Sequence, residues 1–375
     1  MIDYFIIAGE ESADNHGAKL IQELKKKKPN INFRGIGGKK MINNGLVSIE
    51  SIDNMAVMGF VEIIKHLTFF YNLMDKILID INNYQPKQII LIDYPGFNLR
   101  LAKNIKNKFS IPITYYISPQ VWAWKEKRIK SIKKYIDQML VIFPFEENWY
   151  KNRGINAKFV GHPIIHDWEP SKKQDIYKCL NINTSKKIII LYPGSRKQEV
   201  VRHLPVLLNV ASKLNDKNDD LYFILGIAQN INLETIDLHI PNWINIEKNN
   251  PQKALECADF AIVASGTSTI EATVYETPMI IIYKMSYLSW LLSKVLIKVN
   301  YVGMVNIIAN SLIMPEILQN NVTAENIFKL SNQIINNPKK LEKMKFKLQK
   351  VKQLLKGDKN IKSAADYILD LNIKK

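Results

Sequence analysis

The sequence is poor in cysteine and has no long apolar run. Its two cysteines, Cys179 and Cys257, carry no metal-ligand spacing, so we expect no disulfide framework and a reducing, cytoplasmic compartment. No stretch approaches about 18 uninterrupted apolar residues, and we therefore expect no membrane-spanning helix. The N-terminal segment lacks a basic leader followed by a long apolar stretch, and we expect no signal peptide.

Several sequence signatures of cofactor chemistry are also missing. The chain has no GxxxxGK[ST] phosphate loop and no GxGxxG, which removes support for an ATPase or a dinucleotide-binding protein. It has no Asp-x-Asp pair and no HExxH motif, so the sequence implies no divalent metal and no other cofactor.

The composition describes a large, basic, globular protein. A length of 375 residues with 47% hydrophobic residues is sufficient for two domains. The formal net charge of +17 suits nucleic acid, an anionic membrane surface or phosphorylated substrates. A compositional drift toward Lys, Asn and Ile would raise the net charge without any such partner. Much of the excess is local, because residues 339–375 hold twelve Lys against four acids in a helical pattern typical of a solvated face.

Alternating strand and helix patterns predict an α/β fold with parallel sheets. We expect strands at 4–8, 88–93, 113–117, 138–143, 158–160, 187–192, 221–225, 244–247, 259–263 and 279–283, and helices at 18–27, 98–108, 200–214 and 267–275. A polar segment at 162–186 with two prolines is the best linker candidate. The prediction is two Rossmann-like domains facing a central cleft, at 1–165 and 166–355, with C-terminal helices of which 356–375 returns to the first domain.

The most informative segment is 264–272, which follows an apolar strand and opens a helix. Ser265, Gly266 and Thr267 leave backbone N–H groups accessible at the positive end of the helix dipole, which suits a phosphate or diphosphate. Glu271 lies one turn into the helix, within reach of sugar hydroxyls. An ordinary Ser/Thr helix cap is the competing interpretation.

A second strand-to-helix turn, Gly194-Ser195-Arg196, follows the strand at 187–192. The guanidinium of Arg196 is a planar cation that binds two phosphate oxygens at once. Two such corners in one half of the chain indicate a nucleotide diphosphate site.

Candidate acid and base groups lie in the first half. Asp93 ends a strand, where partial desolvation raises a carboxyl pKa and improves a general base, although capping of the next turn is the commoner role. Glu10, Ser12 and Asp14 crowd the first strand-to-helix loop, either as substrate contacts or as helix caps. His162 follows another strand end, near the expected hinge.

Two amphipathic segments, 60–81 and 285–301, combine apolar side chains with lysines. Such a segment lies in a bilayer interface or packs as a core helix whose long lysine side chains reach water.

These motifs together resemble the lipid-A-disaccharide synthase family of glycosyltransferases, which has two Rossmann-like domains of the GT-B type. The similarity runs from the first strand to about residue 330. It is carried by the stretches 9–14 (GEESAD), 56–59 (AVMG), 92–93 (ID), 97–99 (FNL), 118–124 (SPQVWAW), 144–146 (PFE), 160–162 (VGH), 193–196 (PGSR), 264–267 (ASGT) and 300–302 (NYV).

The resemblance implies a metal-free, inverting transfer of 2,3-diacylglucosamine from UDP to the 6-hydroxyl of 2,3-diacylglucosamine 1-phosphate. Asp93 is then the base or an activating residue, with Glu10, Ser12 and Asp14 on the acceptor side. The UDP contacts are Gly194, Ser195, Arg196, Ser265, Gly266, Thr267, Glu271 and Tyr283, and His162 and Asn306 contact acceptor or donor. The family also implies a peripheral position on the cytoplasmic face of the bacterial inner membrane and suggests a homodimer.

The chain departs from the family pattern at two residues and in its final helices, which are richer in lysine than the family norm. Ala13 replaces a glycine in the first loop, which would strain the backbone if that position needs a positive φ. Val305 stands before Asn306 where the family often has proline.

Two other functions compete with this interpretation. A UDP-N-acetylglucosamine 2-epimerase uses the same two-domain arrangement without a lipid acceptor. A nucleic-acid-binding protein has the charge, but its basic residues are spread over several helices without a binding motif, and we expect no nucleic-acid partner.

Overall fold

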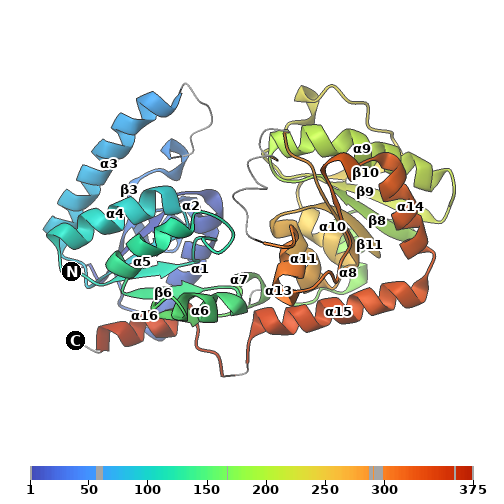
Figure 1. The fold of residues 1–375 in the computed structure, drawn as a ribbon. Helices are drawn as coiled ribbons and strands as arrows, with labels where there is room; N and C mark the ends of the chain where they lie inside the picture. Colours follow the sequence, from blue (N-terminus) through green and yellow to red (C-terminus); the bar gives the residue numbers. More distant parts are fainter. Residues whose placement is uncertain are drawn as a thin grey trace. The chain divides into compact units, whose positions relative to one another are not determined.

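The computed structural model describes residues 2–55, 62–166, 168–286, 290, 299–358 and 360–373. The chain forms two compact units, one made of Met1–Pro163 with Gly357–Lys375 and the other of Ile164–Lys356. Each unit contains one parallel sheet with flanking helices, as Figure 1 shows. The predicted fold class is thereby confirmed. Among the described residues no helix combines the length and the apolarity needed to cross a membrane.

The first unit has a seven-stranded sheet in the order β3-β2-β1-β4-β5-β6-β7. Its strands are β1 (Tyr4–Ala8), β2 (Phe33–Ile36), β3 (Leu46–Glu50), β4 (Gln88–Ile92), β5 (Ile113–Tyr116), β6 (Gln138–Val141) and β7 (Ala157–Phe159). Its helices include α1 (Glu11–Lys27), α2 (Lys39–Asn43), α3 (Glu62–Tyr84), α4 (Pro95–Lys108), α5 (Ile129–Tyr135), α6 (Pro144–Lys151) and α16 (Ala364–Ile373). Because all pairs are parallel, the carboxyl ends of the strands share one edge.

The second unit has a six-stranded sheet in the order β10-β9-β8-β11-β12-β13. Its strands are β8 (Lys187–Tyr192), β9 (Leu221–Gly226), β10 (Ile244–Glu247), β11 (Phe260–Ala264), β12 (Met279–Tyr283) and β13 (Glu316–Leu318). Its helices include α8 (Lys173–Cys179), α9 (Lys197–Asn215), α10 (Pro251–Cys257), α11 (Thr267–Tyr275), α13 (Met304–Ala309), α14 (Ala324–Ile335) and α15 (Pro338–Lys356). A short helix, α7 (Pro163–His166), begins at the boundary between the units.

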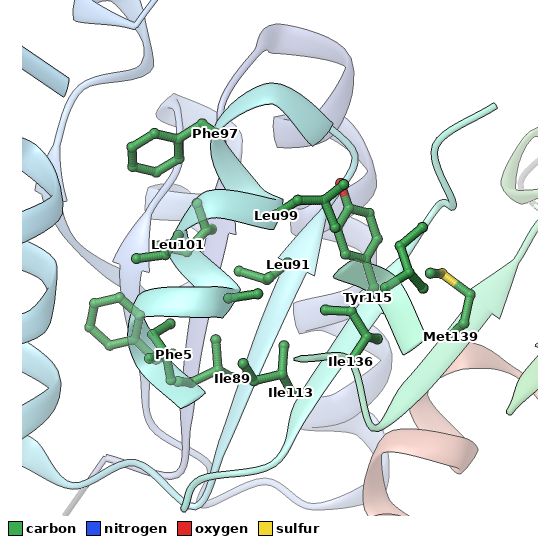
Figure 2. Packing of buried hydrophobic residues seen from close by; sticks show 14 of the residues in the cluster. Phe5, Ile89, Leu91, Phe97, Leu99, Leu101, Ile113, Tyr115, Ile136 and Met139 are labelled. Atoms are coloured by element: carbon green, nitrogen blue, oxygen red, sulfur yellow. The ribbon is translucent and has the colours of Figure 1, made fainter. Parts of the chain in front are cut away.

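The central strands are buried on both faces, which explains their continuous β-branched and apolar sequences. All five residues of β1 and of β4 are buried. Figure 2 shows one face of the first sheet, where Phe5, Leu91 and Tyr115 pack beneath the α4 residues Phe97 and Leu101. A rigid core therefore lies directly below the strand ends that carry the candidate carboxylates.

The structure corrects the predicted start of the first helix. We expected residues 9–17 to form a loop, but α1 begins at Glu11 and includes Gly17. Gly17 acts here through close packing, because a Cβ at this position would lie 2.5 Å from the sulfur of Met41. Ala13 has helical backbone geometry and a buried side chain, so this position does not need the positive φ that the family comparison suggested.

Other differences concern short elements. Strands β2, β3 and β13 were not predicted, and the expected linker at 162–186 contains α7 and α8. Of the two amphipathic segments, most of 285–301 lies outside the described residues. Residues 62–81 belong to α3, where Leu73, Ile77 and Ile81 are buried in the core of the first unit, which fits the core-helix alternative.

We predict that Gly35→Ala destabilises the first unit by about 2–4 kcal/mol, since it combines backbone strain with a clash. Gly35 has a φ of +144°, and a Cβ there would overlap the carbonyl oxygen of Ile6 in the neighbouring strand. Urea unfolding measures the effect. Gly96→Ala is the control, because a Cβ at Gly96 meets nothing within 4 Å. Equal stability of the two variants would contradict this account.

Candidate functional site

Asp93 occupies a strained turn at the carboxyl end of β4. Asp93 and Tyr94 both adopt left-handed backbone conformations, with φ of 45° and 48°. Each such conformation costs an L-residue about 1–2 kcal/mol, so two in succession require compensation by their surroundings. Strain of this kind concentrates at functional sites.

The compensation comes from hydrogen bonds to the main chain of Asp93. The hydroxyl of Tyr115 donates to the Asp93 carbonyl oxygen at 2.5 Å, and Nδ2 of Asn98 donates to the same oxygen at 2.8 Å. The Asp93 N–H donates to the carbonyl of Tyr116 at 3.1 Å. Tyr115 and Asn98 are wholly buried, so these donors form a fixed cradle for the turn.

The structure brings Glu10 and Ser12 to the same edge as Asp93. Ala8 in β1 pairs with Ile92 in β4, so the residues that follow these two strands are neighbours. Burial raises the pKa of Asp93 to about 6, and the charge of Glu10 adds to this shift. The hydroxyl of Ser12 donates to Glu10 Oε1 at 2.6 Å.

Gly9 allows this close approach. A Cβ at Gly9 would lie 2.5 Å from the ring of Tyr94, so only a glycine lets the first loop pass beside the strained turn.

Asp14 differs from the other residues of its segment. Its carboxylate is buried and accepts backbone N–H groups of Gly38, Lys40 and Met41 at 2.7, 3.1 and 3.1 Å. The side chain therefore holds the start of α2, and its oxygens are occupied by the protein's own backbone.

A second buried carboxylate, Glu146, was not singled out as a site residue from the sequence. Its Oε1 accepts from Ser118 at 2.7 Å and from the indole of Trp122 at 2.8 Å, and Oε2 accepts the N–H of Phe143 at 3.2 Å. Burial raises the pKa of Glu146 to about 7. Glu146 thus anchors the segment that follows β5, next to the strand that delivers Asp93.

His162 is also buried, and its ring centre lies 5.5 Å from that of Phe143. The structure places it beside the end of β6, against the same Phe143 whose N–H donates to Glu146.

In the second unit the two predicted strand-to-helix corners, Gly194–Arg196 and Ser265–Thr267, are neighbours. Strands β8 and β11 pair in parallel, with Val263 opposite Tyr192. The turn that follows β8 and the turn that follows β11 therefore meet at one edge, where α9 and α11 begin. Two helix N-termini at one edge concentrate backbone N–H groups and positive potential.

Arg196 and Gly266 make this edge accessible to a ligand. The side chain of Arg196 is 81% exposed and lies 3.2 Å from Glu199. Gly266 has a φ of +153°, and a Cβ there would meet nothing within 4 Å, so the space beyond it is open. Gly194, with φ of +119°, likewise requires a residue without a side chain. Ser195 and Thr267 are exposed at the same edge.

Ser265 and Glu271 lie deeper. The Ser265 hydroxyl donates to the carbonyl of Val302 at 2.8 Å, which fixes the corner. Glu271 is half-buried, and burial raises its pKa to about 7 while the neighbouring Gln252 opposes the shift. A carboxyl group one helical turn after the Gly266 corner can form hydrogen bonds with hydroxyl groups of a ligand.

Asn306 has a structural role in the described geometry. Its side chain is buried, accepts the N–H groups of Ile313 and Met314 at 2.9 Å each, and donates to Glu316 at 2.8 Å. These bonds fix the turn before β13, so we do not include Asn306 among the ligand contacts.

Tyr283 ends β12, with its ring centre 6.2 Å from that of His203. His203 was missed in the sequence, because one histidine inside a helical pattern carries no signal of its own.

No group of three or more His, Cys, Asp or Glu side chains suited to a metal ion occurs in the parts of the chain that the structure describes.

Comparison with known proteins agrees with this architecture. The family model for lipid-A-disaccharide synthetase matches residues 4–369. A lipid-A-disaccharide synthase 1 of Legionella pneumophila (strain Lens) is 40% identical over 368 residues, covering 97% of this chain and 96% of that protein. A lipid-A-disaccharide synthase of Coxiella burnetii (strain Dugway 5J108-111) is 37% identical over 333 residues, covering 88% of each.

Solved structures share the fold at low identity. A UDP-GlcNAc 2-epimerase from Neisseria meningitidis bound to UDP-GlcNAc superposes with a TM-score of 0.67 at 12% identity, covering all of both chains. The calicheamicin glycosyltransferase gives a TM-score of 0.60 at 8% identity, covering 100% of this chain and 99% of that one. The epimerase likeness is one of fold alone, whereas the sequence relatives span nearly the whole chain. The chain belongs to the lipid-A-disaccharide synthetase family and is a hexosyltransferase with the two-domain GT-B fold.

Proposed function

We propose that the chain transfers 2,3-diacylglucosamine from its UDP carrier to the 6-hydroxyl of 2,3-diacylglucosamine 1-phosphate, releasing UDP and a β-1,6-linked tetraacyl disaccharide 1-phosphate. Family membership supports the reaction class. The observation that supports Asp93 as the general base is its strained turn, which is held by hydrogen bonds and in which the carboxyl group has a raised pKa. A general base needs a fixed position and a pKa near the working pH, and this turn supplies both.

The second unit holds the UDP moiety in this proposal. Arg196 and the N–H groups around Gly266 bind the diphosphate, and Ser195, Thr267 and Glu271 add hydroxyl and carboxylate contacts. The support is the shared sheet edge, the exposed guanidinium and the open space at Gly266. These groups stabilise negative charge as the diphosphate leaves.

Asp93 removes the proton from the 6-hydroxyl of the acceptor. As that oxygen forms its bond to the anomeric carbon, the bond from this carbon to the UDP oxygen breaks, and the configuration inverts. Glu10 and Ser12 orient the acceptor, and the charge of Glu10 adds to the rise in the Asp93 pKa that burial causes. In this scheme the surrounding segments of the first unit are held in place by Asp14, Glu146 and His162.

We also propose a peripheral location on the cytoplasmic face of the inner membrane. The acylated substrates of the proposed reaction reside in a bilayer, and a formal charge of +17 favours an anionic surface.

Asp93→Asn is expected to lower kcat by about 10²–10⁴-fold, because the amide cannot accept the proton. UDP affinity should stay within about twofold of wild type, since Asp93 lies in the first unit and the proposed UDP groups lie in the second. A radiolabelled donor assay and UDP calorimetry measure the two quantities. Glu11→Gln, at an exposed residue of α1, is the control and should retain activity. Turnover by Asp93→Asn near the wild-type rate would remove Asp93 from the mechanism.

The pH dependence of kcat/KM should follow the ionisation of Asp93. Its pKa is raised to about 6, so the base is ionised at pH 7–8 and becomes protonated as the pH falls through about 6. Activity should therefore decline about tenfold per pH unit below that value. Replacing Glu10 with Gln removes the neighbouring charge and should shift the decline to lower pH. An activity profile that stays flat from pH 8 to pH 5 would be incompatible with this role.

A further inference from the structure

His203 connects two strand ends through its imidazole ring. The residue lies in the second turn of α9 and is wholly buried. Its Nδ1 lies 2.8 Å from the carbonyl oxygen of Pro193, and its Nε2 accepts the backbone N–H of Lys284 at 3.0 Å. Both partners are main-chain groups, so the ring sets the distance between two backbone segments.

These contacts define one protonation state. Because Nε2 faces a backbone N–H, it must present its lone pair, and the single ring proton of neutral His203 lies on Nδ1 and is donated to Pro193. Burial lowers the pKa of His203, which favours this neutral form. The charged groups nearby are Glu199 and Arg202 of the same helix, and Tyr283 contributes its ring from β12.

The two connected segments lie on either side of the Gly266 corner. Pro193 follows β8 and Lys284 follows β12, and β11 lies between these strands in the sheet. The corner itself is held to β12 by a hydrogen bond from the Ser265 N–H to the Ile282 carbonyl at 2.9 Å. The ring therefore links the turn that carries Arg196 to the segment on the far side of the corner.

We infer that His203 is a positioning residue for the donor diphosphate, holding the Gly194–Arg196 turn in register with the Gly266 corner. The inference rests on the proposed UDP site. Without the ring, the Pro193 carbonyl and the Lys284 N–H lose their partner, and the turn can move relative to the corner. A loss of register weakens contacts with the diphosphate and leaves the acceptor side of the reaction unaffected.

The test compares two substitutions of His203. His203→Leu removes both hydrogen bonds and should raise the Kd of UDP and the KM of the donor about tenfold, with the acceptor KM within about twofold of wild type. His203→Asn keeps a donor that reaches Pro193 and should show a smaller loss, about threefold. If the leucine variant does not fold, the asparagine variant still decides the question. UDP affinity equal to wild type in the variants that fold would overturn the inference.

A buried residue of the same helix provides the matched control. Val210 is also wholly buried but lies about two helical turns further from the start of α9 than His203, so Val210→Ala should lower the Tm and leave UDP affinity unchanged. If Val210→Ala weakens UDP binding as much as His203→Leu at a similar Tm, His203 acts only through stability and the inference fails.

Arg196→Ala separates this inference from the proposed function. If Arg196→Ala leaves UDP affinity unchanged, the proposed UDP site itself is wrong. If Arg196→Ala weakens UDP binding and both His203 variants bind UDP normally, the site stands and only the role of His203 is refuted.

Discussion

The main-chain carbonyl oxygen of Asp93 accepts two hydrogen bonds, from Tyr115 and from Asn98. The proposed mechanism depends on these two bonds. They stabilise a backbone conformation that costs about 1–2 kcal/mol per residue, and they do so from wholly buried side chains. Because the Asp93 carbonyl and N–H are both held by hydrogen bonds, the direction of its Cα–Cβ bond is fixed as well. The core shown in Figure 2, including Tyr115 and Leu91, supplies the rigidity that a precisely placed base requires.

The two units use the carboxyl edge of a parallel sheet for different chemistry. In the first unit the edge collects carboxylates, and burial together with the charge of Glu10 raises the pKa of Asp93 to about 6. In the second unit the edge collects helix N-termini, glycines with positive φ and one exposed guanidinium. An acidic edge suits proton abstraction and a positive edge suits a diphosphate. The proposed transfer requires both kinds of group on one substrate pair.

The sequence predicted the central strands and the two corners well, because periodicity and turn residues are local signals. The helix at Thr267–Tyr275 and the strand at Ile244–Glu247 have the predicted bounds. The start of α1 was misplaced because Gly17 resembles a loop residue, whereas its role is close packing against Met41. The contacts of Asp14, Glu146 and His203 join residues far apart in the chain, and no local pattern reveals them.

Removing the Tyr115 hydroxyl tests the central claim most directly. Tyr115→Phe deletes one of the two side-chain donors to the Asp93 carbonyl and keeps the buried ring. We predict a loss in kcat of about 10–100-fold with UDP affinity unchanged, because a base displaced by about 1 Å transfers protons poorly. Wild-type kcat in a folded Tyr115→Phe enzyme would contradict the claim that this hydrogen bond positions the base.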